Sequence, residues 1–291
     1  MPLPPEGRNP TPRIDRAIHW VAIKGFLKDI LSNLLSFAAA SRDFSLQVSL
    51  GNIPGYSKVN KFGHAVDCDL NTDTDVWDGA DGTTSTDIWV MPTQARAHTL
   101  ASTSGNDVPA GTGMRTCRLY GLLSWDTAEV SEDLDADGTT TNEYVIIHRI
   151  KGLTYGSGGA NAGVITATAA TDGTVTAAIL AGESQTQMAI YGIPSGKCLE
   201  LKQIRADVLR SSPAAVAVDV NLLQIIRPGD SDGGTIHKEH FQMTGDSPLR
   251  RDYDIPKSLP GPCIVKIHVN SSANDSSVTA SFDGYVVDDG A

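Results

Sequence analysis

The chain has 291 residues, and its 34 acidic and 23 basic side chains give a formal net charge of −11. Apolar residues make up 40% of it and charged residues 20%, which predicts a folded chain with a buried core and excludes a disordered one. An acidic surface repels phosphate backbones, so the composition argues against nucleic acid as a partner. The length predicts about two domains, or one large all-β unit.

The N-terminal segment, MPLPPEGRNP, lacks the basic and apolar regions of a secretory signal peptide, and its prolines predict an extended arm. An apolar segment with helical spacing follows, from Ile14 to Ala40. Charged residues interrupt this segment, among them Arg16, Lys24, Lys28 and Asp29. Each charge opposes insertion into a bilayer by roughly 2.5 to 3.5 kcal/mol. We therefore expect a helix that does not span a membrane.

Large apolar side chains recur along this segment at alternating spacings of three and four residues: Trp20, Ile23, Leu27, Ile30, Leu34 and Phe37. This is the spacing of a heptad seam, which favours oligomerisation or anchoring on a partner. The seam covers about two and a half heptads, short of the three or four that are typical of a coiled coil. Packing of the helix on the chain's own β-structure is the alternative.

Beyond the helix, short apolar or alternating runs are separated by turn signals at the spacing of stacked strands. The runs predicted as strands are Phe44–Leu50, Ile88–Met91, Met114–Leu123, Tyr144–Lys151, Val164–Ala169, Val175–Leu180, Thr186–Ile193, Cys198–Arg210, Ala215–Ile226, Ile264–Val269 and Val278–Val287. The predicted fold class is mainly β, with an N-terminal α-helix followed by two β-sandwich or jelly-roll-like domains. The glycine-rich loop Tyr155–Gly163 favours a division into residues 1–43, 44–170 and 171–291.

The run Asp133-Leu-Asp-Ala-Asp-Gly138 has the form of the start of a calcium loop. Carboxylates at alternate positions, here Asp133, Asp135 and Asp137, can converge on one hard cation. The bidentate glutamate expected at the twelfth position is replaced by Tyr144. A solvated hairpin turn ending in Asp-Gly is the favoured alternative. Ca²⁺ is therefore the one cofactor for which the sequence offers a candidate site, and otherwise no cofactor is expected.

Three other features invite a binding interpretation. A second acidic stretch runs from Asp67 to Asp81 and fits either a cation site or a solvated loop. His237 and His240 are three residues apart, so on an unbroken strand their imidazoles would face opposite sides and would not share a metal. The four tryptophans, Trp20, Trp77, Trp89 and Trp125, fit a carbohydrate platform, although packing in the core is the favoured interpretation.

The four cysteines, Cys68, Cys117, Cys198 and Cys263, are widely spaced and form no Cys-x-x-Cys pair. This spacing excludes a zinc ribbon or a redox motif and favours small buried thiols. Neither a Ser/His/Asp nor a Cys/His arrangement is recognisable, so the sequence offers no nucleophile and no catalytic residue.

Four segments carry a resemblance to a known group of proteins. They are Ser102–Leu122, which contains AGTGMRT, together with Trp77-Asp-Gly79, Gly156–Gly163 and Gln185–Lys197. Taken in their order along the chain, they resemble segments of a poorly characterised family of tailed-bacteriophage virion structural proteins. The resemblance covers roughly residues 64–287. It implies a virion component and brings no catalytic residues with it.

The sequence thus predicts a non-enzymatic structural protein of a tailed-phage virion, most simply a head-associated decoration, cement or fibre protein. It would form a homo-oligomer, with a trimer as the first expectation, and bind the major capsid or other virion proteins through its N-terminal arm and helix. The alternative is a tail adaptor, or a tail-fibre or receptor-binding module that holds calcium or a glycan. Neither nucleic acid nor a membrane is an expected partner.

Overall fold

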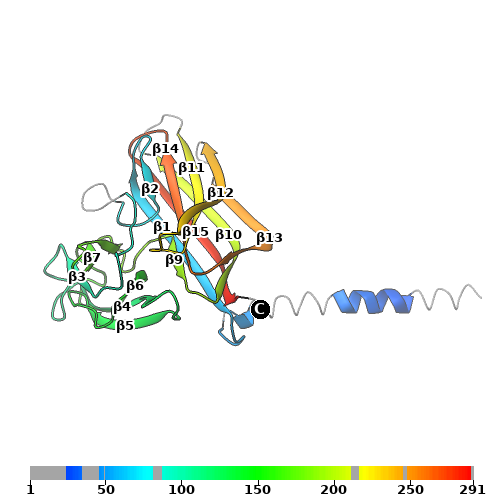
Figure 1. Cartoon of the computed structure of the whole chain (residues 1–291), viewed down its shortest axis with the longest axis horizontal. Coiled ribbons are helices and arrows are strands. Elements are labelled where there is room, and N and C mark those ends of the chain that lie inside the picture. The colour runs from blue at the N-terminus through cyan, green and yellow to red at the C-terminus, as the bar shows by residue number, and fades with distance from the viewer. Residues whose placement is uncertain are drawn as a thin grey trace, which may run out of the picture. The chain divides into compact units, whose positions relative to one another are not determined.

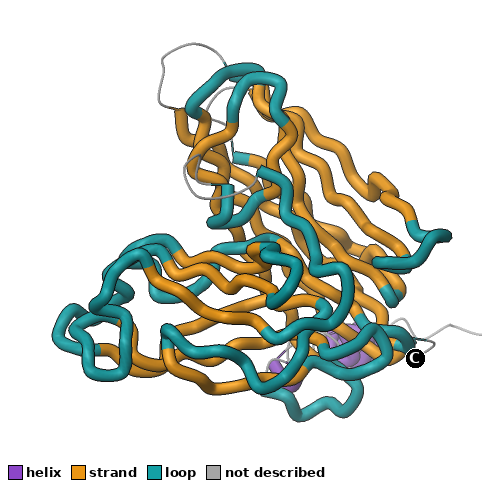
Figure 2. Tube along the Cα trace, turned by 60° about the vertical axis from the view of Figure 1, so that its left-hand side comes forward, coloured by secondary structure: helices purple, strands orange, loops and turns teal. Residues whose placement is uncertain are grey.

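The computed structural model describes residues 24–34, 46–48, 50–80, 87–210, 216–244 and 248–289. The chain forms two units, Met1–Pro54 and Gly55–Ala291. Antiparallel strands dominate the second unit, which confirms the prediction of a mainly β protein with a short N-terminal helix (Figure 2).

In the first unit a helix covers residues 24–34, inside the predicted helix Ile14–Ala40, whose other residues lie outside the described ranges. The helices of the described residues are all too short or too polar to cross a membrane. The strand predicted at Phe44–Leu50 is wrong where the structure describes it, because residues 46–48 form a helical turn. Leu50 N–H donates to the Leu46 carbonyl at 2.9 Å. Apolar residues two apart also fit such a turn, so the alternation alone did not identify a strand.

The second unit contains two larger sheets (Figure 1). In the first, all neighbours are antiparallel, and the order is β1 (Ser57–Cys68), β15 (Ser276–Asp288), β10 (Lys197–Arg210) and β13 (Leu249–Pro260). In the second, the order is β12 (Gly234–Thr244), β11 (Ala217–Ile226), β14 (Cys263–Ser271) and β2 (Asp73–Asp75), and β9 (Ile190–Ile193) also pairs with β14. Both β2 and β9 pair with β14, at different places along it. β2 pairs with the part of β14 around Val269, and β9 pairs with the part around Val265.

The pairing of these strands is nested. β1 pairs with β15, β2 with β14, β10 with β13, and β11 with β12, each time antiparallel. Among these eight strands, therefore, the first pairs with the last, the second with the second last, and so on inward to the β11–β12 hairpin.

Between β2 and β9 the chain forms two smaller sheets, which lie beside the larger ones (Figures 1 and 2). One contains β3 (His98–Ser102), β7 (Ile165–Ala169) and β8 (Val175–Ile179). The other contains β5 (Val130–Asp135), β4 (Met114–Leu122) and β6 (Ile146–Tyr155), with β4 in the middle.

One hydrophobic cluster connects these sheets. Val218, Val220 and Leu222 alternate on β11 and are all buried, and Val278 and Phe282 do the same on β15. Alternation with a period of two places such side chains on a single face of a strand. The cluster also includes buried residues of β4, β6 and β7, so the smaller sheets share the core of the larger ones.

The structure does not divide the chain at residue 170. That position lies between β7 and β8, which pair with each other. β1 and β2 belong to the predicted first domain, yet they pair with β15 and β14 of the predicted second domain. The turn and glycine signals mark loops in the sequence, but they carry no information about which distant strands meet.

Candidate functional site

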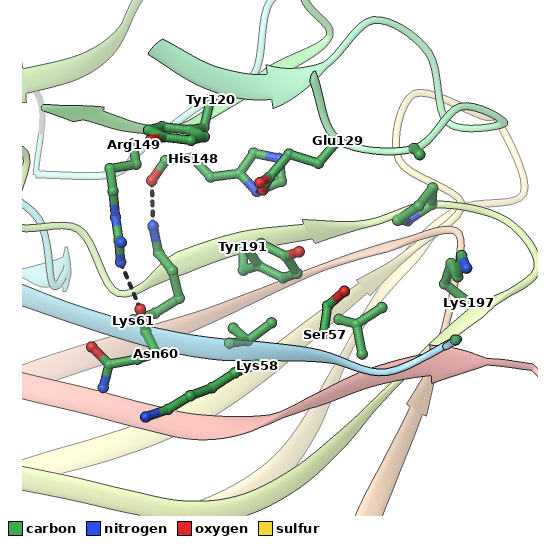
Figure 3. Close-up of a pocket in the computed structure, with 15 residues that line it drawn as sticks. Ser57, Lys58, Asn60, Lys61, Tyr120, Glu129, His148, Arg149, Tyr191 and Lys197 are labelled. Carbon is green, nitrogen blue, oxygen red and sulfur yellow. Dashed lines mark hydrogen bonds and ion pairs between the residues drawn. The ribbon is translucent and has the colours of Figure 1, made fainter. Parts of the chain in front are cut away.

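The second unit contains a cavity of about 710 Å³ bordered by β1, β4, β6 and β9 (Figure 3). Polar, charged and aromatic side chains line it: Lys58, Lys61, Tyr120, Glu129, His148, Arg149, Tyr191 and Lys197. The volume falls within the range of about 300–1,000 Å³ that is typical of ligand pockets. Cationic and hydrogen-bonding groups around such a space are suited to binding a polar ligand.

Lys61 occupies an inward position of β1. Val59, Lys61 and Ala65 share the buried face of this strand, and Lys61 is 4% exposed. Burial and the nearby guanidinium of Arg149 lower the pKa of Lys61 well below its usual value, and the Glu129 carboxylate opposes this shift. A buried amine needs a hydrogen-bond acceptor, and Lys61 Nζ donates to a backbone carbonyl of β6, a strand of one of the smaller sheets.

That carbonyl belongs to His148, the extra residue of a bulge in β6. Tyr120 of β4 faces Arg149, whereas the next residue of β4 faces Ile147, so His148 has no partner on β4. A bulge leaves its extra residue outside the ladder and redirects the side chain. The bulge therefore makes the carbonyl of His148 available to Lys61 and places the imidazole at the cavity (Figure 3).

The imidazole of His148 is 1% exposed. Its Nδ1 lies 3.4 Å from Glu129 Oε2, yet neither ring nitrogen has a hydrogen-bond partner among the described residues. The Tyr191 ring packs against it edge-on, with the ring centroids 4.5 Å apart. Burial, followed by the positive charges of Lys61 and Arg149, lowers the pKa of His148 well below its usual value, so the imidazole is neutral at neutral pH.

Glu129 is the carboxylate of this cavity, and its side chain is 40% exposed. Partial burial raises the pKa of Glu129, while the charges of Lys61 and Arg149 oppose the rise. Arg149 Nη2 donates to the backbone oxygen of Asn60 on β1 at 2.7 Å. Strands of a larger and a smaller sheet thus hold the charged groups of the cavity in place.

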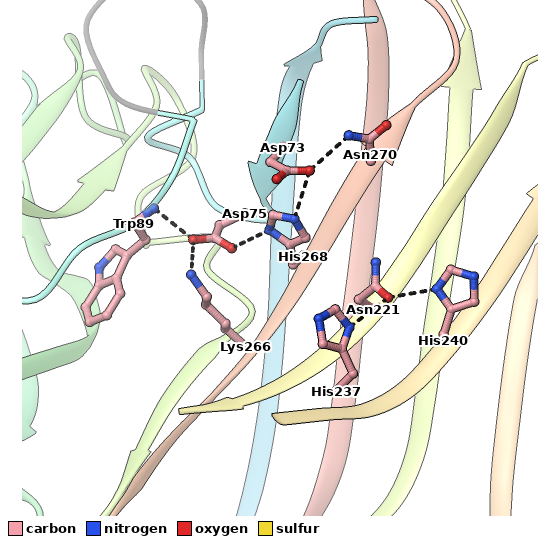
Figure 4. Close-up of polar contacts among 9 residues, drawn as sticks. All are labelled: Asp73, Asp75, Trp89, Asn221, His237, His240, Lys266, His268 and Asn270. Atoms are coloured by element: carbon pink, nitrogen blue, oxygen red, sulfur yellow. Dashed lines mark hydrogen bonds and ion pairs between the residues drawn. The ribbon is translucent and has the colours of Figure 1, made fainter. Parts of the chain in front are cut away.

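A second polar group crosses the β12-β11-β14-β2 sheet (Figure 4). Along one row of the sheet, His240 faces Asn221, Asn221 faces His268, and His268 faces Asp75. The carboxylate of Asp75 is fully buried and contacts Lys266 Nζ at 2.6 Å and His268 Nδ1 at 3.1 Å. This group ties the short strand β2 to β14.

The structure places His237 and His240 on the same face of β12, both beside the Asn221 amide. Their Nδ1 atoms lie 3.4 and 2.8 Å from Asn221 Oδ1. A register shift leaves Lys238 as an extra residue between the partners of β11, which are His237 and Glu239. The prediction that the two imidazoles face opposite sides is therefore wrong, because a bulge shifts the alternation by one residue.

The Asp-rich run predicted as a calcium loop or a hairpin turn spans the end of β5 and the turn after it. Asp133 and Asp135 alternate on the exposed side of β5, and Asp137 follows in the turn. Arg118 holds Asp133 from the neighbouring strand, with Nε–Oδ1 at 2.5 Å and Nη2–Oδ2 at 2.7 Å. Gly138 N–H donates to the Asp135 carbonyl at 2.9 Å, which closes the turn. The three carboxylates are not brought together as a set of ligands within the described residues.

The other acidic stretch does contribute to a cluster of carboxylates. Asp67, Asp69 and Asp275 each offer an oxygen within 4.8 Å of the others. Asp69 and Asp275 are exposed, and Asp81 at the end of the stretch lies outside the described residues. Asp67 and Asp69 belong to the stretch for which a cation site and a solvated loop were the two sequence interpretations, and Asp275 joins them from outside that stretch.

The predicted oligomerisation seam is described in part. Leu27, Ile30 and Leu34 lie on the helix and are exposed, at 57%, 39% and 60%. The other seam residues, Trp20, Ile23 and Phe37, lie outside the described residues.

The tryptophans do not form a carbohydrate platform in the described structure. Trp77 and Trp89 are buried in the core, and Trp125 is partly buried against it. Trp89 Nε1 donates to the Thr176 carbonyl at 2.8 Å, a bond that ties its loop to β8. Trp20 lies outside the described residues.

The four segments that carry the family resemblance meet in pairs. Asp107, in the first of them, accepts hydrogen bonds from the backbone of Ala162 and Gly163 in the glycine-rich one. Asp78 of Trp77-Asp-Gly79 accepts a hydrogen bond from Gln187 N–H at 2.9 Å, in the fourth. The polar residues of these segments therefore join loops that are distant in the sequence.

Comparison with known proteins adds no relative: no family model, curated protein or solved structure matches the chain.

Sequence reasoning missed the residues of the cavity. One signal was present, because Lys61 interrupts the alternating small and apolar positions of Val59, Gly63 and Ala65. A second was His148, which follows three apolar residues inside a predicted strand. A charged or titratable residue at an inward position is costly unless it has a partner or a function.

Proposed function

We propose that this chain is a non-enzymatic structural component of a tailed-phage virion, a head-associated decoration, cement or fibre protein that assembles through its N-terminal helix. The observation that carries the proposal is the apolar surface of that helix. Phe26, Leu27, Leu31 and Leu34 are all more than half exposed on residues 24–34. Exposed apolar surface of this extent on one helix marks an interaction site, because burying it against a partner is favourable.

The nested strand pairing supports a scaffold of the jelly-roll type. A jelly roll has eight strands in two sheets, and viral capsid domains use it. Rolling up one long antiparallel hairpin pairs the first strand with the eighth, the second with the seventh, and so on inward. Eight strands of this chain follow the rule: β1, β2, β10, β11, β12, β13, β14 and β15. They lie four in each of the two larger sheets, in the orders β1-β15-β10-β13 and β12-β11-β14-β2. We propose that these strands form a single jelly-roll domain into which the smaller sheets are inserted.

The helix makes a homo-oligomer the expected state, with a trimer as the first expectation, because heptad positions line a seam between helices. Leu27, Ile30 and Leu34 follow this spacing within the described helix. The same apolar surface of the helix would bind the major capsid protein or another virion protein. We therefore propose that the chain is located in the virion, attached to one of these proteins.

Sedimentation velocity on the full-length chain tests the association. We expect an oligomer for the wild type and a monomer for the double variant Leu27→Asp/Leu34→Asp, since buried charges would oppose the interface. Ser32→Asp, on the opposite side of the same helix, is the matched control and should remain oligomeric. A monomeric wild type at micromolar concentration would overturn the role of the helix.

Mass spectrometry of gradient-purified particles of the phage that encodes the chain tests the location. Peptides of the chain should co-purify with intact particles. If they remain in the soluble fraction of the lysate, the assignment to the virion fails.

A further inference from the structure

The cavity bordered by β1, β4, β6 and β9 has features that an assembly scaffold does not require. We propose that it binds a small sugar acid, a hydroxylated ring that carries a carboxylate. This binding activity goes beyond the assembly role and does not depend on the helix.

The first argument is charge. Four basic side chains line the cavity, Lys58, Lys61, Arg149 and Lys197, and Lys197 is ion-paired with Asp288; within the described residues Glu129 is the lining carboxylate. The whole chain carries a formal charge of −11, so the sign of the charge is locally reversed. A recessed site lined by one sign of charge concentrates ligands of the opposite sign.

The second argument is the unmet hydrogen-bonding capacity of His148. Its ring is buried at the cavity, and neither nitrogen has a hydrogen-bond partner in the described part of the chain. A neutral imidazole offers one donor and one acceptor. A hydroxyl group can satisfy either of them, because it both donates and accepts. This requirement favours a hydroxylated ligand over a simple inorganic anion.

The third argument is the mixture of ring surfaces and charge. Tyr120 and Tyr191 line the same space as Arg149 and provide flat apolar surfaces beside a guanidinium (Figure 3). A guanidinium forms strong paired hydrogen bonds with a carboxylate, and aromatic rings pack against the carbon-bound faces of a sugar. The two kinds of surface together match a ring with a carboxylate substituent.

Glu129 acts in this arrangement as an internal substitute for the ligand carboxylate. Its Oε2 lies 3.4 Å from His148 Nδ1, and it is the negative charge that partly offsets Lys61 and Arg149. The side chain is 40% exposed, so it is able to rotate out of the cavity. An incoming carboxylate replaces it, and displacement of Glu129 uncovers the ring of His148.

Isothermal titration calorimetry on the full-length protein tests this proposal with three probes: sodium glucuronate, glucose and inorganic phosphate. Glucuronate should bind, whereas glucose, which lacks the carboxylate, and phosphate, which lacks the ring, should bind at least about tenfold more weakly. Absence of heat with glucuronate overturns the proposal. Equal binding of glucose or of phosphate overturns the assignment to a sugar acid.

Two variants with opposite expected effects separate binding from folding. Arg149→Gln should weaken glucuronate binding about tenfold or more, because it removes the guanidinium partner of the carboxylate. Glu129→Gln should strengthen binding several-fold, because it removes the competing internal charge. A gain in affinity cannot come from a misfolded protein. If Glu129→Gln weakens glucuronate binding or leaves it unchanged, the proposal that the ligand carboxylate displaces Glu129 is wrong.

Lys151→Gln is the matched control, since Lys151 lies on β6 two residues beyond Arg149 and is exposed outside the cavity. Its affinity for glucuronate should equal that of the wild type. An equal loss in Lys151→Gln and Arg149→Gln would indicate a general effect of surface charge and would overturn the site. The helix variants Leu27→Asp/Leu34→Asp should bind glucuronate normally, so this test and the assembly test fail independently.

Discussion

The carboxylate of Asp107 accepts a hydrogen bond from the backbone N–H of Gly163, 56 positions further along the chain, at 2.9 Å. The same carboxylate accepts from the N–H groups of Met114 and Ala162, each at 2.8 Å, and from the Ser102 hydroxyl at 2.6 Å. Asp107 is fully buried. One side chain therefore joins β3, the start of β4 and the loop before β7.

Asp107→Ala should be strongly destabilising. The substitution leaves the buried N–H groups of Met114 and Gly163 without an acceptor, and each such group costs about 1–3 kcal/mol. We expect a loss of about 3 kcal/mol or more in the free energy of unfolding, measured by urea denaturation. Asp126→Ala, at an exposed loop position, is the control and should change this free energy by less than about 0.5 kcal/mol. Similar urea midpoints for Asp107→Ala and Asp126→Ala would show that the hydrogen bonds to Asp107 do not stabilise the fold.

Asp107 should also make stability depend on pH. Burial by itself raises the pKa of Asp107, but the hydrogen bonds from Ser102 and from three backbone N–H groups outweigh it, so the pKa lies below its ordinary value. A carboxyl with a lowered pKa in the folded state stabilises fully above the pKa of the unfolded chain, about 3.9, and loses this contribution as the pH falls through the folded-state pKa.

Asp107→Asn cannot titrate and serves as the reference for this effect. The difference in unfolding free energy between wild type and Asp107→Asn should be constant from about pH 7 to pH 5 and should shrink below about pH 4. Urea denaturation across this range measures it. A difference that is independent of pH down to about pH 2 would contradict the shift.

The buried ion pair between Asp75 and Lys266 leads to a third prediction. Asp75→Ala leaves the Lys266 ammonium, which is 6% exposed, without its partner and removes the acceptor of Trp89 N–H. Loss of one partner of a buried pair costs about 3–5 kcal/mol, whereas replacement of both by apolar residues is often nearly neutral. The double variant Asp75→Leu/Lys266→Met should therefore be more stable than Asp75→Ala in thermal unfolding. The opposite order would contradict the burial of this pair.

Gly63 should not tolerate a side chain. It lies on β1, where a Cβ atom would overlap the backbone oxygen of Val76 and lie 2.5 Å from the backbone nitrogen of Ala189. Backbone atoms cannot rotate away, so we expect Gly63→Ala to cost about 3 kcal/mol. Gly105→Ala is the matched control, since nothing lies within 4 Å of its Cβ position. Equal melting temperatures for the two variants would refute the close approach of β1 to these segments.

The thiols should be unreactive in the folded protein. All four cysteines are free and buried. Burial, as the largest cause, raises the pKa to about 12 for Cys68 and Cys117 and to about 11 for Cys198 and Cys263. The thiolate is the reactive form, so a thiol-specific chromophore should label the native chain slowly and all four cysteines in denaturant. Rapid labelling of the native chain would place at least one thiol at the surface.

The sequence predicted best the strands that have a buried face. Val218, Val220 and Leu222 alternate within a predicted strand, and the structure places them on the core side of β11. Burial of one face imposes a period of two on the sequence, and the same signal correctly located β4, β6, β7, β8, β10 and β15. It did not apply at residues 88–91, where a strand was predicted and the structure has none.

The sequence missed strands at sheet edges and at short pairings. β12 and β13 are edge strands, and most of their residues are exposed or partly exposed. Backbone hydrogen bonds to a neighbour hold such strands in place, and these bonds leave no mark in the side-chain pattern. β1 was not among the predicted strands, and the turn signal Pro54-Gly55 lies just before its first residues.

The candidate site was beyond reach for a related reason. Lys61 and His148 are 87 positions apart, and the bond between them depends on a bulge in β6. A bulge changes which side of a strand a residue faces without altering composition or spacing. The same effect reversed the prediction for His237 and His240. Long-range strand pairing and local bulges arise only in the folded chain, so the periodicity of apolar residues in the sequence does not predict them.

The chain leaves the second larger sheet after β2 and returns to it at β9, and both of these strands dock on β14. The excursion between them, which holds β3 to β8, thus begins and ends at neighbouring points of one strand. Its endpoints are set by the sheet, while its interior is not needed to close the nested pairs. Exposed loops of this excursion can therefore change in sequence while the surrounding strands keep their order, whereas its inward residues are constrained because they pack in the core that the sheets share.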